Sequence, residues 1–168
     1  DNEPAFFFRG TPITGIDPWK HFSGLCFFLI DPIKFESVDN SGGALGSFDV
    51  GPTNWWGFRT NTLQERSNVI SFMKNFMKNG QLLQIFTVLQ TDTSDIHADE
   101  WAADSLVLGT TIFNEMAKLG AVRFNELEKV RNVPYVYFGE KGKGLLKEAI
   151  GSDITDIVDI NQPFPSIM

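Results

Sequence analysis

Cysteine is nearly absent from this sequence: the 168 residues include a single one, Cys26. One cysteine excludes an internal disulfide and leaves the redox compartment undecided. Cys26 lies inside the apolar run 25–30. A reactive thiol needs an exposed, electropositive environment, so this position is typical of a buried small hydrophobic residue.

Long apolar segments and an excess of basic charge are lacking as well. The longest uninterrupted apolar run is about six residues, whereas a membrane-spanning helix needs about 20, so no membrane insertion is expected. The 21 acidic and 14 basic residues give a net charge of −7, which argues against a nucleic-acid partner and against a polybasic membrane patch. The chain begins at Asp1 with no signal peptide, and we expect it to be a processed or excised piece.

What is present suits one globular domain. A chain of this length buries roughly 70% of its unfolded surface and needs no disulfide, metal or cofactor to fold. Phenylalanine is abundant, with 16 residues against 2 tyrosines. Phenylalanine has no polar group, so most of these rings should lie in the core. We expect near-complete burial of Phe28, Leu29, Phe72, Phe76, Ile85 and Val88.

Hydrophobic patterning predicts an α+β fold with a mixed sheet and two to three flanking helices. Strands are expected at 5–8, 22–31, 35–38, 45–50, 82–90, 121–124, 135–138 and 154–160. The strands at 35–38 and 45–50 should form a hairpin around the turn 40–43. Helices are expected from the capping box at 62–65 to about 78, and at 101–108, 111–119, 125–130 and 145–150.

Four ordered segments carry a family resemblance. They are the buried strand 24–31 followed by Phe48-Asp49, the helix from Val69 to Lys78 that leads into the strand 83–89, the helix ending in Leu-Gly at 113–121, and the aromatic strand leading into glycines and lysines at 135–144. Together they resemble the interleukin-like EMT inducer domain, also called the GG or PANDER-like domain. The resemblance covers about residues 22–160; segment 1–21 would pack on this domain, and 161–168 would be a tail or the start of a linker.

The resemblance implies a single β-β-α globule that works outside the cell or at its surface. Vertebrate secreted members have paired cysteines that are missing here, which favours a bacterial member cut from a larger secreted or surface protein. Its implied work is non-catalytic binding of a carbohydrate or protein ligand. The alternatives are an accessory domain that packs against a neighbouring domain, and a hydrolase. No catalytic residue is expected, because the sequence has no Gly-x-Ser-x-Gly elbow and nominates no carboxylate pair.

Sugar-binding members of that family imply three positions in this chain. Their Arg-Gly pair at the start of the first buried strand is replaced here by Ser23-Gly24. Their carboxylate after the next buried strand corresponds best to Asp92, displaced by about one residue. Their arginine ahead of the aromatic strand corresponds to Arg131.

The stretch 51–57 is interpreted as an aromatic loop, with Trp55 and Trp56 adjacent and with Asn54 and Arg59 able to supply hydrogen bonds. Indole rings beside polar groups suit sugar faces and protein hot spots. In the alternative interpretation both rings cover one end of the core. The candidate ligand-binding residues are Asn54, Trp55, Trp56, Arg59, Asp92 and Arg131.

Two other segments have the composition of a possible site. Residues 92–100 gather carboxylates around His97 and could suit Ca²⁺, but their spacing is not that of an EF-hand. We therefore expect no metal there, only a solvated acidic loop in which Asp95 or Asp99 is the N-cap of a helix. The glycines at 139–144 surround Lys141 and Lys143, but they match no phosphate-binding motif and predict a plain turn.

Overall fold

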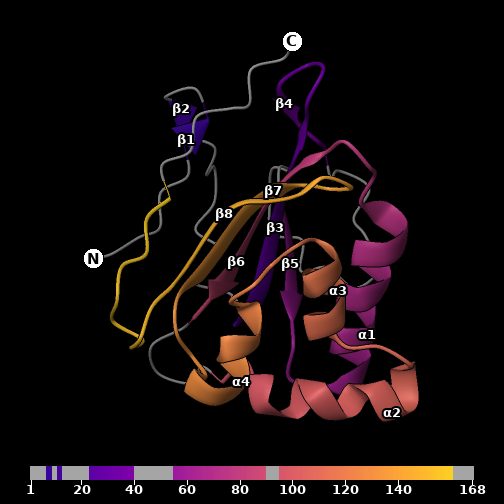
Figure 1. Ribbon diagram of the computed structural model, residues 1–168, viewed down its shortest axis with the longest axis vertical. Helices are drawn as coiled ribbons and strands as arrows, with labels where there is room; N and C mark the ends of the chain where they lie inside the picture. The colour runs from indigo at the N-terminus through magenta and orange to yellow at the C-terminus, as the bar shows by residue number, and fades with distance from the viewer. Residues whose placement is uncertain (1–6, 9–10, 13–22, 40–54, 90–94, 161–168) are drawn as a thin grey trace.

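The computed structural model describes residues 7–8, 11–12, 23–39, 55–89 and 95–160, and these residues adopt an α+β fold (Figure 1). The main sheet consists of β3 (Gly24–Asp31), β4 (Glu36–Ser37), β5 (Trp55–Arg59), β6 (Leu82–Val88), β7 (Tyr135–Glu140) and β8 (Gly144–Ile150). β4 and β5 both pair with one side of β3, and β6, β7 and β8 follow in that order on its other side. A separate pair joins β1 (Phe7–Phe8) to β2 (Thr11–Pro12).

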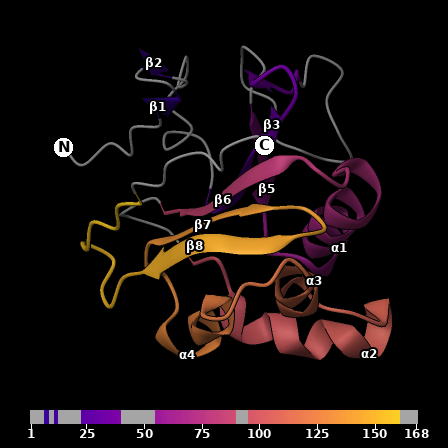
Figure 2. The same ribbon diagram turned by 45° about the horizontal axis from the view of Figure 1, so that its top comes forward.

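The expected α+β class is confirmed, but the sheet is not mixed. Every strand pair in the described part of the chain is antiparallel. The helices gather on one face of the sheet, as both ribbon views show (Figures 1 and 2). This arrangement lets one apolar layer form between the sheet and the helices.

Strand β3 is central, and its expected burial on both faces is confirmed. Leu25, Phe27 and Leu29 join the core under the helices, while Cys26 and Phe28 join a second cluster on the opposite face. Burial raises the pKa of the Cys26 thiol, as a core position would.

The helix at the expected capping box begins as predicted. In α1 (Leu63–Ser71) the Thr62 hydroxyl accepts a hydrogen bond from the Glu65 N–H at 3.2 Å, and the Glu65 carboxylate accepts one from the Thr62 N–H at 2.9 Å. The helix continues as a π-helical turn, η2 (Phe72–Phe76). It packs on the sheet through Val69, Ile70, Phe72 and Met73.

The remaining helices are short, and most of them lie at the lower end of the sheet in Figure 1. They are the 3₁₀ helix η3 (Ala98–Asp104), α2 (Ser105–Leu108), α3 (Ile112–Lys118), the 3₁₀ helix η4 (Phe124–Glu126) and α4 (Leu127–Val130). They correspond to the helices expected at 101–108, 111–119 and 125–130. Four α-helices are therefore described where two to three were expected.

Three expected elements are wrong. Residues 145–150 form strand β8 and not a helix, because pairing with β7 outweighs the helix propensity of leucine, lysine, glutamate and alanine. No strand forms at 121–124, where the Val122 and Arg123 N–H groups both donate to the Glu148 carboxylate at 2.9 Å. Residues 154–160 are irregular, since the Asp156 carboxylate accepts hydrogen bonds from the 152 and 153 N–H groups and closes a turn.

Burial follows the prediction at all but one of the selected positions. Phe28, Leu29, Phe72, Ile85 and Val88 are buried. Phe76 is only partly buried at the end of η2. In the expected hairpin, residues 36–37 form β4 and pair with β3, while 40–43 and 45–50 lie outside the described residues.

Candidate functional site

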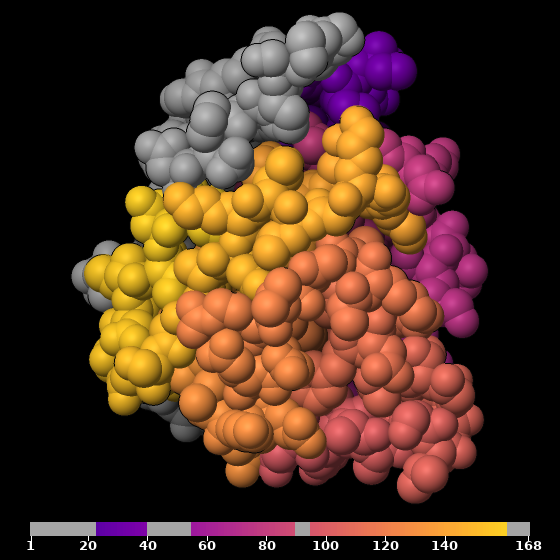
Figure 3. Space-filling view, viewed as in Figure 1, coloured from indigo at the N-terminus to yellow at the C-terminus, as the bar shows by residue number. Residues whose placement is uncertain are grey.

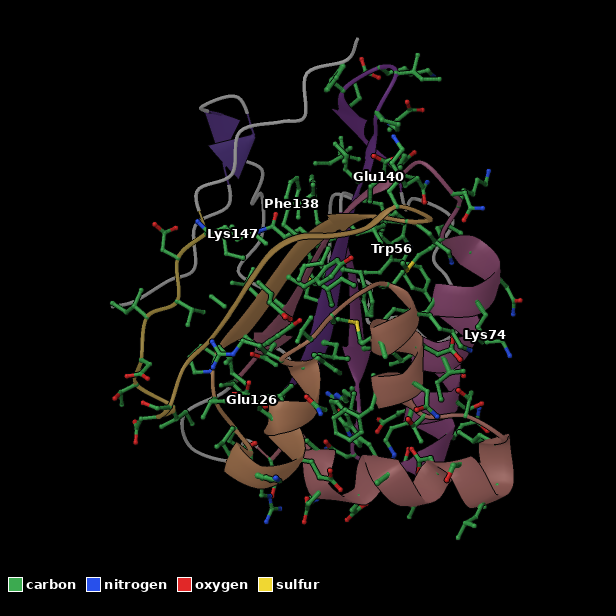
Figure 4. All side chains as sticks on the ribbon, viewed as in Figure 1. Trp56, Lys74, Glu126, Phe138, Glu140 and Lys147 are labelled. Carbon is green, nitrogen blue, oxygen red and sulfur yellow. The ribbon has the colours of Figure 1, made fainter. Side chains whose placement is uncertain are left out.

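The two tryptophans do not form an exposed aromatic loop. Trp55 and Trp56 are consecutive residues of strand β5, so their side chains enter opposite faces of the sheet. Trp56 is completely buried; its ring centroid lies 5.5 Å from that of Phe72 and 5.3 Å from that of Phe76. Figure 4 labels Trp56 between the sheet and α1. Trp55 is 8% exposed in the cluster on the other face. The interpretation as core aromatics is the correct one, and neither ring offers a face to a sugar.

The other members of the candidate set are scattered. Arg59 is exposed at the end of β5, opposite Gly24 in the β3–β5 register. Asn54 and Asp92 lie outside the described residues. The glycine of the Ser23-Gly24 pair has a steric role, because a Cβ at position 24 would lie 2.0 Å from the Phe58 carbonyl oxygen. The glycine therefore serves the close approach of β5 to β3.

Arg131 is the predicted residue that the structure places in a polar cluster. Its Nη2 contacts the Asp95 carboxylate directly and lies 3.2 Å from Oδ1 of Asp99. The guanidinium belongs to the residue after α4, and the carboxylates flank the start of η3. Side-chain exposure is 43% for Arg131, 31% for Asp95 and 43% for Asp99. A ligand from solvent can therefore reach these three charged side chains, which we call the Arg131 cluster.

Unusual backbone geometry surrounds the Arg131 cluster. Among the described residues, four that are not glycine have positive φ, and three of them are His97 at 52°, Arg131 at 44° and Asn132 at 28°. Each such residue costs of order 1–3 kcal/mol and persists only where surrounding contacts fix it. Strain of this kind is concentrated in functional sites more often than elsewhere, which makes this cluster the best candidate.

Hydrogen bonds to the backbone fix that geometry. The Asn132 side-chain oxygen accepts from the Ile96 N–H at 3.0 Å, and the Asp95 carboxylate accepts from the His97 N–H at 2.7 Å. The buried Ile96 carbonyl accepts from the Thr60 hydroxyl at 2.9 Å and from the Trp101 indole N–H at 3.1 Å. The carboxylates of the cluster are thus tied to the core on one side and to the segment of Arg131 on the other.

The expected N-cap at Asp95 or Asp99 is wrong. His97 stands at the N-cap of η3 in a left-handed conformation and makes no capping hydrogen bond with its side chain. The His97 Nδ1 lies 3.4 Å from the Glu100 carboxylate. Within the described ranges, no group of three His, Cys, Asp or Glu residues is arranged to hold a metal ion.

Chemically, the Arg131 cluster pairs a fork of N–H donors with carboxylate acceptors. This combination recognises neighbouring hydroxyl groups or another polar, planar ligand. Sequence reasoning identified Arg131 but missed Asn132, and it assigned Asp95 and Asp99 to capping. The contact between Arg131 and Asp95 joins residues 36 positions apart, and no local pattern in the sequence predicts it.

Comparisons with known proteins give no family assignment. No protein-family model matches the chain, and neither a curated protein nor a solved structure matches it. Among the described residues, no helix has the length and apolar character needed to span a membrane.

Proposed function

We propose that this chain is a non-catalytic, extracellular recognition module that binds a glycan at the Arg131 cluster. The observation that supports it most is the contact of Arg131 with Asp95 and Asp99 at a partly exposed, strained segment. The resemblance implies a carboxylate after the second buried strand and an arginine before the aromatic strand. Asp92, the residue that corresponds best to that carboxylate, lies outside the described residues. Asp95 follows β6, Arg131 precedes β7, and the two side chains are in contact, so in this proposal Asp95 supplies the carboxylate.

The chemistry of the cluster fits hydroxyl groups better than a large apolar ligand. Asp95 and Asp99 offer acceptors, and the Arg131 guanidinium offers donors in a fixed plane. The buried tryptophans cannot stack on a sugar ring, so polar contacts must supply most of the binding energy. A partly exposed polar site of this kind implies an affinity of about millimolar per site.

A glycan array with the intact chain, followed by titration calorimetry, tests this proposal. We expect Arg131→Ala to weaken glycan binding about tenfold or more, since a charge-assisted hydrogen bond contributes about 1.5–3 kcal/mol. Asp99→Asn should weaken binding by a smaller factor, because the amide keeps one acceptor. Arg123→Ala is the matched control: Arg123 is also a half-exposed arginine bonded to a carboxylate, but it pairs with Glu126.

Two results would contradict the proposal. One is the absence of binding to any glycan on the array by a chain that melts cooperatively. The other is a glycan affinity that Arg131→Ala and Arg123→Ala change equally. Thermal melts of each variant separate loss of binding from loss of folding.

A second function, packing against a neighbouring domain, is supported by a different observation. Helix α2 exposes two large apolar side chains, Leu106 at 90% and Val107 at 70%. Exposed apolar groups of this kind suit an interdomain contact. Hydrogen exchange at α2, compared between this chain alone and the larger protein that the accessory role requires, tests this function. Slower exchange in the larger protein would support the accessory role, and equal exchange would exclude α2 as the contact.

A further inference from the structure

A second polar site lies away from the Arg131 cluster, in an open pocket between the α1–η2 helix and α3. Its volume is about 560 Å³, within the range of small-molecule sites. The lining residues are Lys74, Leu108, Gly109, Thr110, Asn114, Ala117 and Lys118. Figure 3 shows the helical face on which α3 and α1 meet, and Figure 4 labels Lys74 on the α1 side.

The charges that line this pocket are opposite in sign to the net charge of the chain. Lys74 and Lys118 are its charged lining residues, and no carboxylate is among the residues that line it. The chain as a whole carries −7. A locally positive pocket on an acidic protein attracts an anion that the rest of the surface repels.

One buried carboxylate underlies the lysines. Glu115 accepts hydrogen bonds from the Lys118 ammonium and the Thr110 hydroxyl, both at 2.7 Å. Burial by itself raises the pKa of Glu115, but these two hydrogen bonds and the charges of Lys118 and Lys74 outweigh it, so the pKa is lowered. Glu115 is therefore ionised at neutral pH and holds Lys118 in place.

The lysines keep capacity for a ligand after this pairing. Lys118 uses one of three N–H donors on Glu115 and is 63% exposed. In the described part of the chain, no side chain or carbonyl forms a hydrogen bond or ion pair with the Lys74 ammonium. The ammonium of Lys141, which bonds the Met73 carbonyl, adds a third positive charge near Glu115. At the pocket itself, Lys74 and Lys118 thus outnumber the one carboxylate that pairs with them.

We infer that this pocket binds a small ligand that carries an oxyanion, either a carboxylate or a phosphate. The ammonium groups of Lys74 and Lys118 would hold the oxyanion, and the Asn114 amide would bond a neighbouring polar group. Leu108 and Ala117 provide an apolar surface for the body of the ligand. The pocket is large enough for one sugar ring. This inference does not depend on the Arg131 cluster.

Three sugars that differ at one carbon test the inference: glucose, glucuronate and glucose 6-phosphate. In titrations of the ¹⁵N-labelled chain followed by NMR, we expect the two anionic sugars to shift the amides of Gly109, Thr110, Asn114 and Lys118. Glucose should leave them unchanged at the same concentrations. The tighter of the two anionic sugars identifies the preferred oxyanion.

Substitutions then assign the charge. Lys74→Gln should weaken binding at least fivefold and Lys74→Glu should abolish it, whereas Lys129→Gln, at an exposed lysine of α4, should have no effect. Arg131→Ala should also leave this binding unchanged, which separates this site from the proposed glycan site. Equal binding of glucose and glucuronate, no binding of either anionic sugar, or full binding by Lys74→Gln would each overturn the inference.

Discussion

A buried ion pair fastens α1 to η3, the helix at whose start the carboxylates of the Arg131 cluster lie. Arg66 donates to Asp104 through Nε at 2.7 Å and through Nη2 at 3.0 Å. Its Nη1 donates to the Thr60 and Asn61 carbonyls at 3.1 and 3.2 Å. The side chains of Arg66 and Asp104 are only 6% and 3% exposed. We therefore expect this pair to be one of the most sensitive polar contacts in the chain.

Removing either Arg66 or Asp104 alone should lower the free energy of unfolding substantially. Asp104→Ala leaves a buried guanidinium with only the half-exposed Glu100, 3.4 Å away, as a countercharge. Breaking such a pair destabilises a protein by about 3–5 kcal/mol, because the remaining charge stays desolvated. Arg66→Met should cost a similar amount through the stranded Asp104. The double variant Arg66→Met/Asp104→Leu should recover most of the loss, since no charge is left buried.

Urea unfolding measures each free energy, and a double-mutant cycle gives the coupling. The chain supplies a matched control with the same fork geometry at the surface. Arg123 bonds Glu126 through Nε at 2.9 Å and Nη2 at 3.0 Å, and both side chains are nearly half exposed. Water screens that pair, so Arg123→Ala should leave the free energy of unfolding almost unchanged. Equal effects for Asp104→Ala and Arg123→Ala would refute the argument from burial.

Three further predictions concern backbone strain, steric fit and pH. His97→Gly should be more stable in urea than His97→Ala by about 1 kcal/mol, because its φ of 52° strains any residue with a Cβ; equal stability would contradict strain there. Gly24→Ala should cost several times more than Gly109→Ala in the same assay, because both glycines have positive φ but only Gly24 faces a carbonyl 2.0 Å from the new Cβ. Burial raises the pKa of Glu115, but hydrogen bonds from an ammonium and a hydroxyl outweigh burial and hold the pKa below its ordinary value. Because the pKa of Glu115 is lower in the folded state, the ionised carboxylate stabilises the fold, and this stabilisation is lost as the pH falls through that pKa. Glu115→Gln should therefore flatten the decline in melting temperature below about pH 4.5. A decline that is the same in Glu115→Gln would exclude Glu115 as its source.

Elements whose signal is local could be predicted from the sequence. The α1 start depends on Thr62 and Glu65, which are three residues apart and bond each other directly. Strand β3 shows apolar residues at nearly every position because helices cover one face of it and a second apolar cluster covers the other. Each of these two patterns lies within a single element, so the sequence of that element is enough to predict its structure.

Elements whose state depends on distant partners could not be predicted. Residues 145–150 have helix-forming side chains, but β7 offers them backbone partners along its length, with one irregularity at Phe138 and Gly139. The interpretation of Trp55 and Trp56 as a loop followed from the preceding glycine, proline and asparagine, while pairing with Phe28 and Phe27 of β3 determines their real state. In both cases tertiary contacts outweigh local propensity.

The Arg131 cluster, as a candidate site, depends on distant contacts in the same way. The family resemblance predicts Arg131 from its position just before β7. The partners of Arg131, however, are positioned by hydrogen bonds that begin in the core. The Ile96 carbonyl is held by Thr60 and Trp101, and its N–H is held by Asn132, next to Arg131. The strain at 97, 131 and 132 is stable only while these bonds persist. Loosening η3 at the Arg66–Asp104 pair should therefore separate the carboxylates from Arg131 and weaken the proposed glycan binding, at a site that neither Arg66 nor Asp104 contacts.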